Sequence, residues 1–97
     1  MTIINDAYNA SPDSMEAALK ILGRYKNRKV AILGDMFEMG EHTEYGHRLV
    51  GKSAVDNTDV IIAIGKDSKF ISEEAKALGF NENNIHHFNT KEEAIEK

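Results

Sequence analysis

The chain has 97 residues, a formal net charge of −4 and no cysteine, with 41% hydrophobic and 29% charged residues. That balance is typical of one small globular domain, and it excludes disulfides, thiolate metal sites and cysteine nucleophiles. The negative charge argues against a nucleic-acid partner, because phosphate backbones are bound by clustered Lys and Arg. The longest apolar run, residues 60–64, is far shorter than the roughly 20 residues of a membrane helix. We therefore expect no membrane partner and a cytoplasmic location.

The first strand and helix are predicted within residues 2–23. Residues 2–5 form a short β-branched run, which indicates a buried strand. Ser11 and Pro12 suit the cap and first turn of a helix, and Gly23 suits its end. Apolar residues at helical spacing give this helix an inward face of Met15, Ala18, Leu19 and Leu22.

A second strand and helix follow. Residues 29–33 repeat the strand pattern and end at Gly34. A loop from Met36 to about His42 leads into a helix that ends at residues 56–57. Its inward face is predicted to carry Tyr45, Leu49, Val50 and Ala54.

The rest of the chain continues the alternation. Residues 60–64 form an uninterrupted apolar strand, which is typical of strands covered on both faces. The next helix spans about 68–78, with an inward face of Ile71, Ala75 and Leu78. Residues 85–88 form a weaker strand, and Thr90 with Glu93 is a capping-box pattern that opens a fourth helix.

Four alternating strand–helix units define the predicted fold class. Short connections between them predict an α/β domain of Rossmann-like, three-layer type with a mainly parallel sheet. The first strand starts directly after Met1, and Lys97 ends the fourth helix after about two turns. We therefore expect a single domain over residues 1–97 that is incomplete at its C-terminal end.

Three groups of residues, 5–11, 34–41 and 65–68, lie where three of the predicted strands end. In an open parallel sheet, ligands bind beyond these carboxyl ends. Asp6 can accept hydrogen bonds from hydroxyls such as a ribose diol, Asn9 can donate and accept, and Tyr8 offers a flat apolar face with a polar tip. Asp and Asn also satisfy loop backbone groups, so a purely structural role for Asp6 and Asn9 stays open.

The loop after the second strand supplies further candidates. Met36 and Phe37 are large apolar residues that need a core or a partner surface, and packing is the favoured role. Asp35 directly follows a strand and faces the presumed cleft, so it is a candidate site residue. His47, near the start of the second helix, is a candidate for ligand contact.

The four histidines do not form a metal-binding pattern. His42 and His47 are five residues apart and lie on different helix faces, while His86 and His87 are adjacent on a strand and point oppositely. Without cysteines or a helical histidine pair, we expect no metal site. The glycine-rich nucleotide motifs and hydrolase elbows are also absent. The residues alone predict an α/β ligand-binding or enzyme domain without a complete set of catalytic residues.

Two stretches carry specific motifs. Residues 4–15 read INDAYNASPDSM, and residues 30–41 read VAILGDMFEMGE, with His47 and Gly51 after them. In order and spacing these stretches resemble the two signatures of the C-terminal domain in MurF-type members of the Mur ligase family. Together they cover the first half of the chain, and the strand–helix pattern of the second half agrees.

The resemblance implies an ATP- and magnesium-dependent ligase of peptidoglycan-precursor synthesis. Such an enzyme adds D-alanyl-D-alanine to UDP-N-acetylmuramoyl-tripeptide through an acyl phosphate formed by ATP on the tripeptide carboxylate. The family's phosphate loop, lysine and metal ligands belong to a central domain, so ATP and Mg are expected to be bound mainly outside this chain. The chain alone, without the N-terminal and central domains, is expected to be inactive and to contain no catalytic residue.

The resemblance also implies residue roles. Asp6 matches the family's acidic residue that binds the ribose side of ATP. The residues that would bind the incoming dipeptide are Tyr8, Asn9 and Ser11. Asp35 and His47 match the second signature, with a site-shaping role.

Departures and alternatives accompany the resemblance. Ser11 replaces the usual asparagine, which leaves its substrate contact open, and a later lysine-glycine-serine-arginine-like segment is absent. A standalone α/β binding or interaction module stays open, as does a sibling Mur ligase, although Tyr8, Asn9 and Ala10 argue against the sibling. An uncovered sheet edge also motivates the hypothesis of a homodimer.

Overall fold

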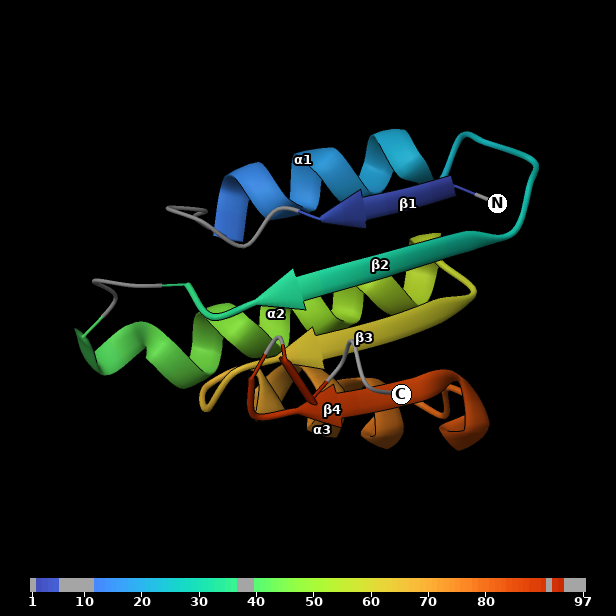
Figure 1. The fold of residues 1–97 in the computed structure, drawn as a ribbon. Coiled ribbons are helices and arrows are strands. Elements are labelled where there is room, and N and C mark those ends of the chain that lie inside the picture. The colour runs from blue at the N-terminus through green and yellow to red at the C-terminus, as the bar shows by residue number, and fades with distance from the viewer. Residues whose placement is uncertain (1, 6–11, 37–39, 91, 94–97) are drawn as a thin grey trace.

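The computed structural model describes residues 2–5, 12–36, 40–90 and 92–93. Four parallel strands form one sheet: β1 (Thr2–Asn5), β2 (Lys29–Gly34), β3 (Val60–Ile64) and β4 (Ile85–Phe88). Their order in the sheet is β1-β2-β3-β4, the same as their order in the chain. The predicted α/β class and its parallel sheet are therefore confirmed (Figure 1).

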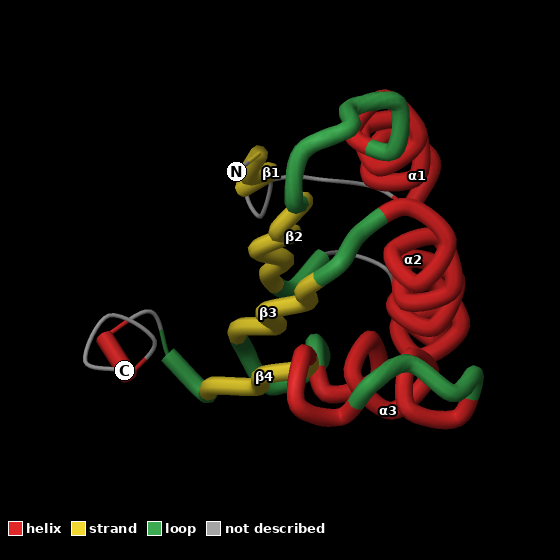
Figure 2. Tube along the Cα trace, turned by 90° about the vertical axis from the view of Figure 1, so that its right-hand side faces the viewer, coloured by secondary structure: helices red, strands yellow, loops and turns green. Residues whose placement is uncertain are grey.

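Three helices connect the strands: α1 (Pro12–Leu22), α2 (Thr43–Asn57) and α3 (Lys69–Ala77). Short 3₁₀ helices precede α2 at Gly40–His42 and β4 at Glu82–Asn84. All three α-helices cover the same face of the sheet (Figure 2). The strand order explains this, because successive right-handed crossovers that always step in one direction place every helix on one side.

The predicted fold has a second helical layer on the other face of the sheet. Of that layer, the described residues contain only the start of a helix at residues 92–93. Thr90 Oγ1 accepts a hydrogen bond from the Glu93 N–H at 3.2 Å, and a Glu93 carboxylate oxygen accepts one from the Asn89 N–H at 3.1 Å. Residues 92–93 are helical, and the Thr90 bond is one of the two bonds of the predicted capping box, while the Glu93 side chain bonds Asn89 in place of Thr90. The chain that leaves β4 turns away from α1, α2 and α3 (Figure 2).

The hydrophobic core lies between the sheet and the three helices. Ala31 and Leu33 of β2 are fully buried beside Ile61 and Ala63 of β3 in the parallel register. The helices complete the core with Met15, Leu19, Leu22, Val50, Ala54, Ile71 and Ala75. Each of these seven has an exposed fraction of 2% or less, which is the close packing expected of a protein interior.

Two residues that the helical spacing assigned to the core are on the surface. Tyr45 is 69% exposed, and Leu78 is 48% exposed and follows the last residue of α3. In α2 the buried face consists instead of Gly46, His47, Val50, Gly51, Ser53 and Ala54. Small and polar residues occupy this face because α2 packs closely on α3. A Cβ atom at Gly51 would lie 2.7 Å from the Ile71 carbonyl oxygen. A hydrophobicity pattern does not detect such a face.

Candidate functional site

The candidate site lies at the carboxyl edge of the sheet, where the arrowheads of the strands meet the loops to the helices (Figure 1). Asp6, Tyr8, Asn9 and Ser11 follow β1 and lie outside the described residues. Phe37 also lies outside them. Of the predicted site residues, the structure describes Asp35 and His47.

Asp35 links the end of β2 to the start of α3. Its Oδ1 accepts a hydrogen bond from the Ser68 N–H at 2.8 Å and lies 2.7 Å from the Ser68 hydroxyl. That hydroxyl also lies 3.0 Å from the Ile64 carbonyl, so its single proton can bond either oxygen. Ser68 is fully buried. The carboxylate thus occupies the N-terminal end of α3, where a negative charge is favoured by the helix dipole.

Gly65, at the end of β3, makes room for this carboxylate. It has a φ of 123°, which is strained for any residue with a side chain. A Cβ atom at this position would also overlap the Asp35 carboxyl group. The Gly65 N–H donates to the Phe88 carbonyl, and the Gly65 carbonyl lies 2.7 Å from His87 Nε2. The ends of β2, β3 and β4 are thereby joined.

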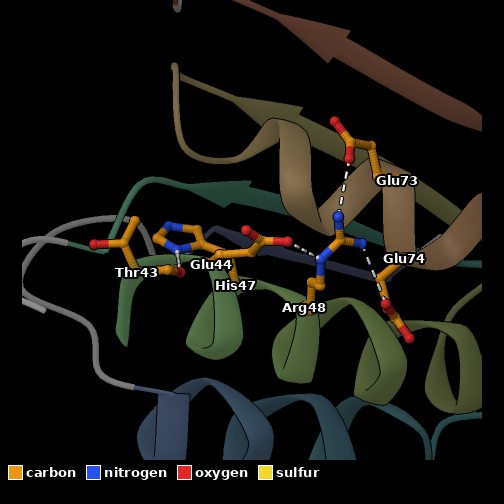
Figure 3. Close-up of polar contacts among 6 residues, drawn as sticks. All are labelled: Thr43, Glu44, His47, Arg48, Glu73 and Glu74. Carbon is orange, nitrogen blue, oxygen red and sulfur yellow. Dashed lines mark hydrogen bonds and ion pairs between the residues drawn. The ribbon is translucent and has the colours of Figure 1, made fainter. Parts of the chain in front are cut away.

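His47 holds the residue that follows Asp35. Its side chain is fully buried, and its Nε2 accepts a hydrogen bond from the Met36 N–H at 3.0 Å. Nδ1 lies 2.7 Å from the Thr43 carbonyl oxygen (Figure 3). Since Nε2 accepts, Nδ1 carries the proton and donates it to Thr43, which fixes a neutral tautomer. The predicted packing role of Met36 is confirmed, because its side chain is 1% exposed.

Both described candidates therefore make polar contacts within the protein, His47 through both ring nitrogens and Asp35 through Oδ1. Asp35 and His47 hold the residues at positions 35–36 from opposite sides, one through α3 and the other through α2. The site-shaping role of these two residues stays a prediction. The sequence placed residues 65–68 at this edge because they directly follow a predicted strand, but it assigned no role to Gly65 or Ser68.

A second polar cluster joins α2 to α3 on the outer surface. Arg48 contacts Glu44 at 2.8 Å, Glu73 at 3.0 Å and Glu74 at 3.3 Å (Figure 3). Its guanidinium also lies 5.3 Å from the centre of the Phe70 ring, within the range of a cation–π contact. The hydrogen bond to Glu44 is the main cause that raises the pKa of Arg48, with smaller contributions from Glu74 and Glu73, while burial opposes the rise.

Metal binding has no support in the part of the chain that the structure describes. It contains no group of three or more His, Cys, Asp or Glu residues that could hold an ion. His86 and His87 are both exposed and alternate along β4. Among the described helices, none is long and apolar enough to cross a membrane.

The parallel sheet and its crossover helices define an α/β domain of the Rossmann-like class. The family profile described as "Mur ligase, glutamate ligase domain" matches residues 1–97, the whole chain. The chain therefore belongs to the Mur ligase family.

Its relatives include two bacterial ligases with the same name, UDP-N-acetylmuramoyl-tripeptide--D-alanyl-D-alanine ligase. The Bacillus subtilis (strain 168) enzyme is 35% identical over 99 residues, which cover 99% of this chain and 21% of the relative. The Escherichia coli (strain K12) enzyme is 37% identical over 71 residues, which cover 72% of this chain and 16% of the relative. The chain thus spans about one fifth of the length of the first of these relatives.

A solved structure gives the same result. Crystal structure II of MurF from Acinetobacter baumannii superimposes with a TM-score of 0.79 and 30% sequence identity, over 97% of this chain and 20% of that one. The fold and the family therefore agree, and both correspond to one part of a longer protein.

Proposed function

We propose that this chain is the C-terminal domain of an ATP-dependent amide ligase. The complete enzyme would join D-alanyl-D-alanine to UDP-N-acetylmuramoyl-tripeptide in peptidoglycan-precursor synthesis in the cytoplasm. The observation that carries the proposal is the match of nearly the whole chain, at 35% identity, to a relative named for that reaction. A sibling ligase is less well supported, since these relatives carry the D-alanyl-D-alanine name.

The reaction has two steps. The tripeptide carboxylate attacks the γ-phosphorus of ATP, which gives an acyl phosphate and ADP. The amine of the dipeptide then attacks the acyl carbon, phosphate leaves, and the amine loses a proton as the amide forms. The acyl phosphate is hydrolysed if water reaches it, so a domain that closes over the site protects it. Closure is the task that we assign to this chain.

Four residues after β1 are proposed to contact ligands. Asp6 would accept hydrogen bonds from the ribose hydroxyls of ATP, and the dipeptide would contact Tyr8, Asn9 and Ser11. Asp35 and His47 would shape the neighbouring loop, in line with their contacts to Ser68 and Met36. Mg and the phosphates of ATP are assigned to the remainder of the enzyme, because the resemblance places the family's phosphate loop and metal ligands in a central domain.

The test is an assay of the full-length polypeptide. With ATP, Mg, the tripeptide nucleotide and D-alanyl-D-alanine, it should release one ADP and one phosphate per amide formed. The 97-residue chain should give no product. Replacing Asp6 by Ala should raise the KM for ATP, and replacing Asn9 by Ala should raise the KM for the dipeptide. ATP turnover without amide formation, or amide formation only with another amino substrate, would contradict the proposal.

Homodimer formation through the edge strands β1 or β4 also stays a proposal. Each edge presents unpaired backbone groups on one side in the described sheet. Light scattering of the 97-residue chain over a range of concentrations tests it, and a constant monomer mass would rule it out.

A further inference from the structure

The residues at positions 35–36 are held on both sides by buried polar contacts. Asp35 Oδ1 bonds the Ser68 N–H and hydroxyl at the start of α3, at 2.8 and 2.7 Å. The Met36 N–H bonds Nε2 of His47 on α2 at 3.0 Å. We call Asp35, Met36, His47 and Ser68 the strand-end brace. It connects both flanking helices to the point where β2 ends.

The chemistry of the brace is specific at His47. Only an unprotonated Nε2 can accept the Met36 N–H, and the proton on Nδ1 is used by the Thr43 carbonyl. Neither ring nitrogen is left for a ligand, and the side chain is fully buried. Its interaction with the ligand-side edge of the sheet is therefore indirect, through the backbone of Met36.

We infer that His47 is a positioning residue for the dipeptide, and that it acts with Asp35 as one unit. The inference rests on the proposed function. The brace fixes where the loop after β2 leaves the sheet, beside β1, since Asn5 of β1 pairs with Ile32 of β2 and directly precedes the proposed contacts to the ATP ribose and to the dipeptide. The phosphates of ATP are assigned to the remainder of the enzyme and only Asp6 is proposed to contact the ribose, whereas three of the four proposed contacts serve the dipeptide. A displaced loop should therefore weaken dipeptide binding more than ATP binding.

Variants of His47 test whether the hydrogen-bond acceptor for the Met36 N–H matters, or only the volume of the buried side chain. In His47→Gln the amide oxygen lies near the place of Nε2, so the bond to Met36 can form. In His47→Asn the amide reaches only as far as Nδ1, and in His47→Leu the acceptor is gone. Val50→Ala is the matched control, because Val50 is also fully buried on α2 but belongs to the apolar core.

The readout in the full-length enzyme is kcat/KM for D-alanyl-D-alanine, with the KM for ATP measured alongside. His47→Leu and His47→Asn should lower kcat/KM for the dipeptide by roughly 10- to 100-fold, the usual effect of misplacing a reacting group by about 1 Å. His47→Gln and Val50→Ala should stay within about threefold of the wild type, and so should the KM for ATP in all four variants.

A double-mutant cycle tests whether the brace is one unit. Asp35→Ala should lower kcat/KM for the dipeptide, and adding it to His47→Leu should lower it little further, because both changes release the same loop. Losses that multiply would overturn the inference of a single unit. The ¹⁵N spectrum of the His47 ring should show a protonated Nδ1 and an unprotonated Nε2, and the Met36 amide should shift strongly in His47→Leu but not in His47→Gln.

Two further results would overturn the positioning role. One is a loss in Val50→Ala equal to that in His47→Leu at a temperature where both variants are folded. The other is an equal rise in the KM values for ATP and for the dipeptide. If the wild-type enzyme makes no amide at all, the proposed function fails, while the ring tautomer and the Met36 shift still test the brace itself.

Discussion

The strand-end brace and the Arg48 cluster are two polar networks that both tie α2 to another part of the domain, and they differ in burial. In the brace, His47 and Ser68 are fully buried. In the cluster, the Arg48 side chain is 31% exposed and three carboxylates share it. A buried polar group that loses its partner keeps the full cost of desolvation, whereas water replaces the partner of an exposed charge. The brace should therefore dominate the energetics although it contains fewer charges.

Replacing Gly65 by Ala should have the largest effect on stability. The new Cβ atom overlaps the Asp35 carboxyl group, and the residue must also keep a φ of 123°. Backbone strain of about 1–3 kcal/mol and the displaced Asp35–Ser68 bonds should together lower the free energy of unfolding by roughly 3 kcal/mol or more. Urea unfolding of the 97-residue chain, followed by circular dichroism, measures this. Gly79→Ala is the control, since Gly79 also has a positive φ but no atom within 4 Å of its Cβ position.

Asp35→Ala should be the next most damaging change. It leaves the buried Ser68 N–H without its acceptor and removes the negative charge from the start of α3. We expect a loss of about 1–3 kcal/mol in the free energy of unfolding. The same urea experiment applies, with Asp67→Ala as a neighbouring control. Equal losses in the two variants would mean that the brace is no more important than an ordinary turn.

Gly51→Ala tests the packing of α2 on α3 without changing any charge. The added methyl group would lie 2.7 Å from the Ile71 carbonyl oxygen and 3.1 Å from the Glu74 Cβ atom, so the two helices must separate slightly. Alanine favours a helix over glycine by about 1 kcal/mol, which offsets part of the cost of overpacking. A net loss of roughly 1 kcal/mol is expected in thermal or urea unfolding. A gain in stability would show that α3 moves freely on α2.

Arg48→Met should have the smallest effect. An exposed ion pair typically contributes about 0.2–1 kcal/mol to the free energy of unfolding, and salt should reduce that contribution. Unfolding in low salt and in 1 M NaCl, compared with the wild type, measures both. Glu82→Gln, which removes an exposed pair with Lys76, is the control and should change almost nothing. A loss larger than that of Asp35→Ala would reverse the ranking of the two networks.

The sequence predicted the fold well because apolar periodicity and turn residues agree along most of the chain. All four strands and the three connecting helices lie where their patterns indicated. Tyr45 and Leu78 were assigned to the core wrongly because spacing alone does not show which apolar residue of a helix faces the sheet. The close contact at Gly51 leaves no room for a large side chain there.

The candidate site was only partly predictable. Asp35 was recognised by its place at a strand end, but its partner Ser68 is 33 residues away, and no local pattern connects the two. His47 was chosen as a possible ligand contact, and its burial assigns it to the backbone of Met36 instead. Asp6, Tyr8, Asn9 and Ser11 remain predictions that the kinetic experiments test.

The identical order of the strands in the chain and in the sheet has a consequence for biosynthesis. Each strand pairs with the one made just before it, with paired residues 24 to 30 positions apart, and never waits for a later segment to fill a central position. As the nascent chain leaves the ribosome, the sheet can therefore grow outward from β1, and each helix can close over the unit that has just formed. In the described sheet the unpaired backbone groups lie on β1 and on the strand that was added last, and only the second of these edges moves as synthesis proceeds.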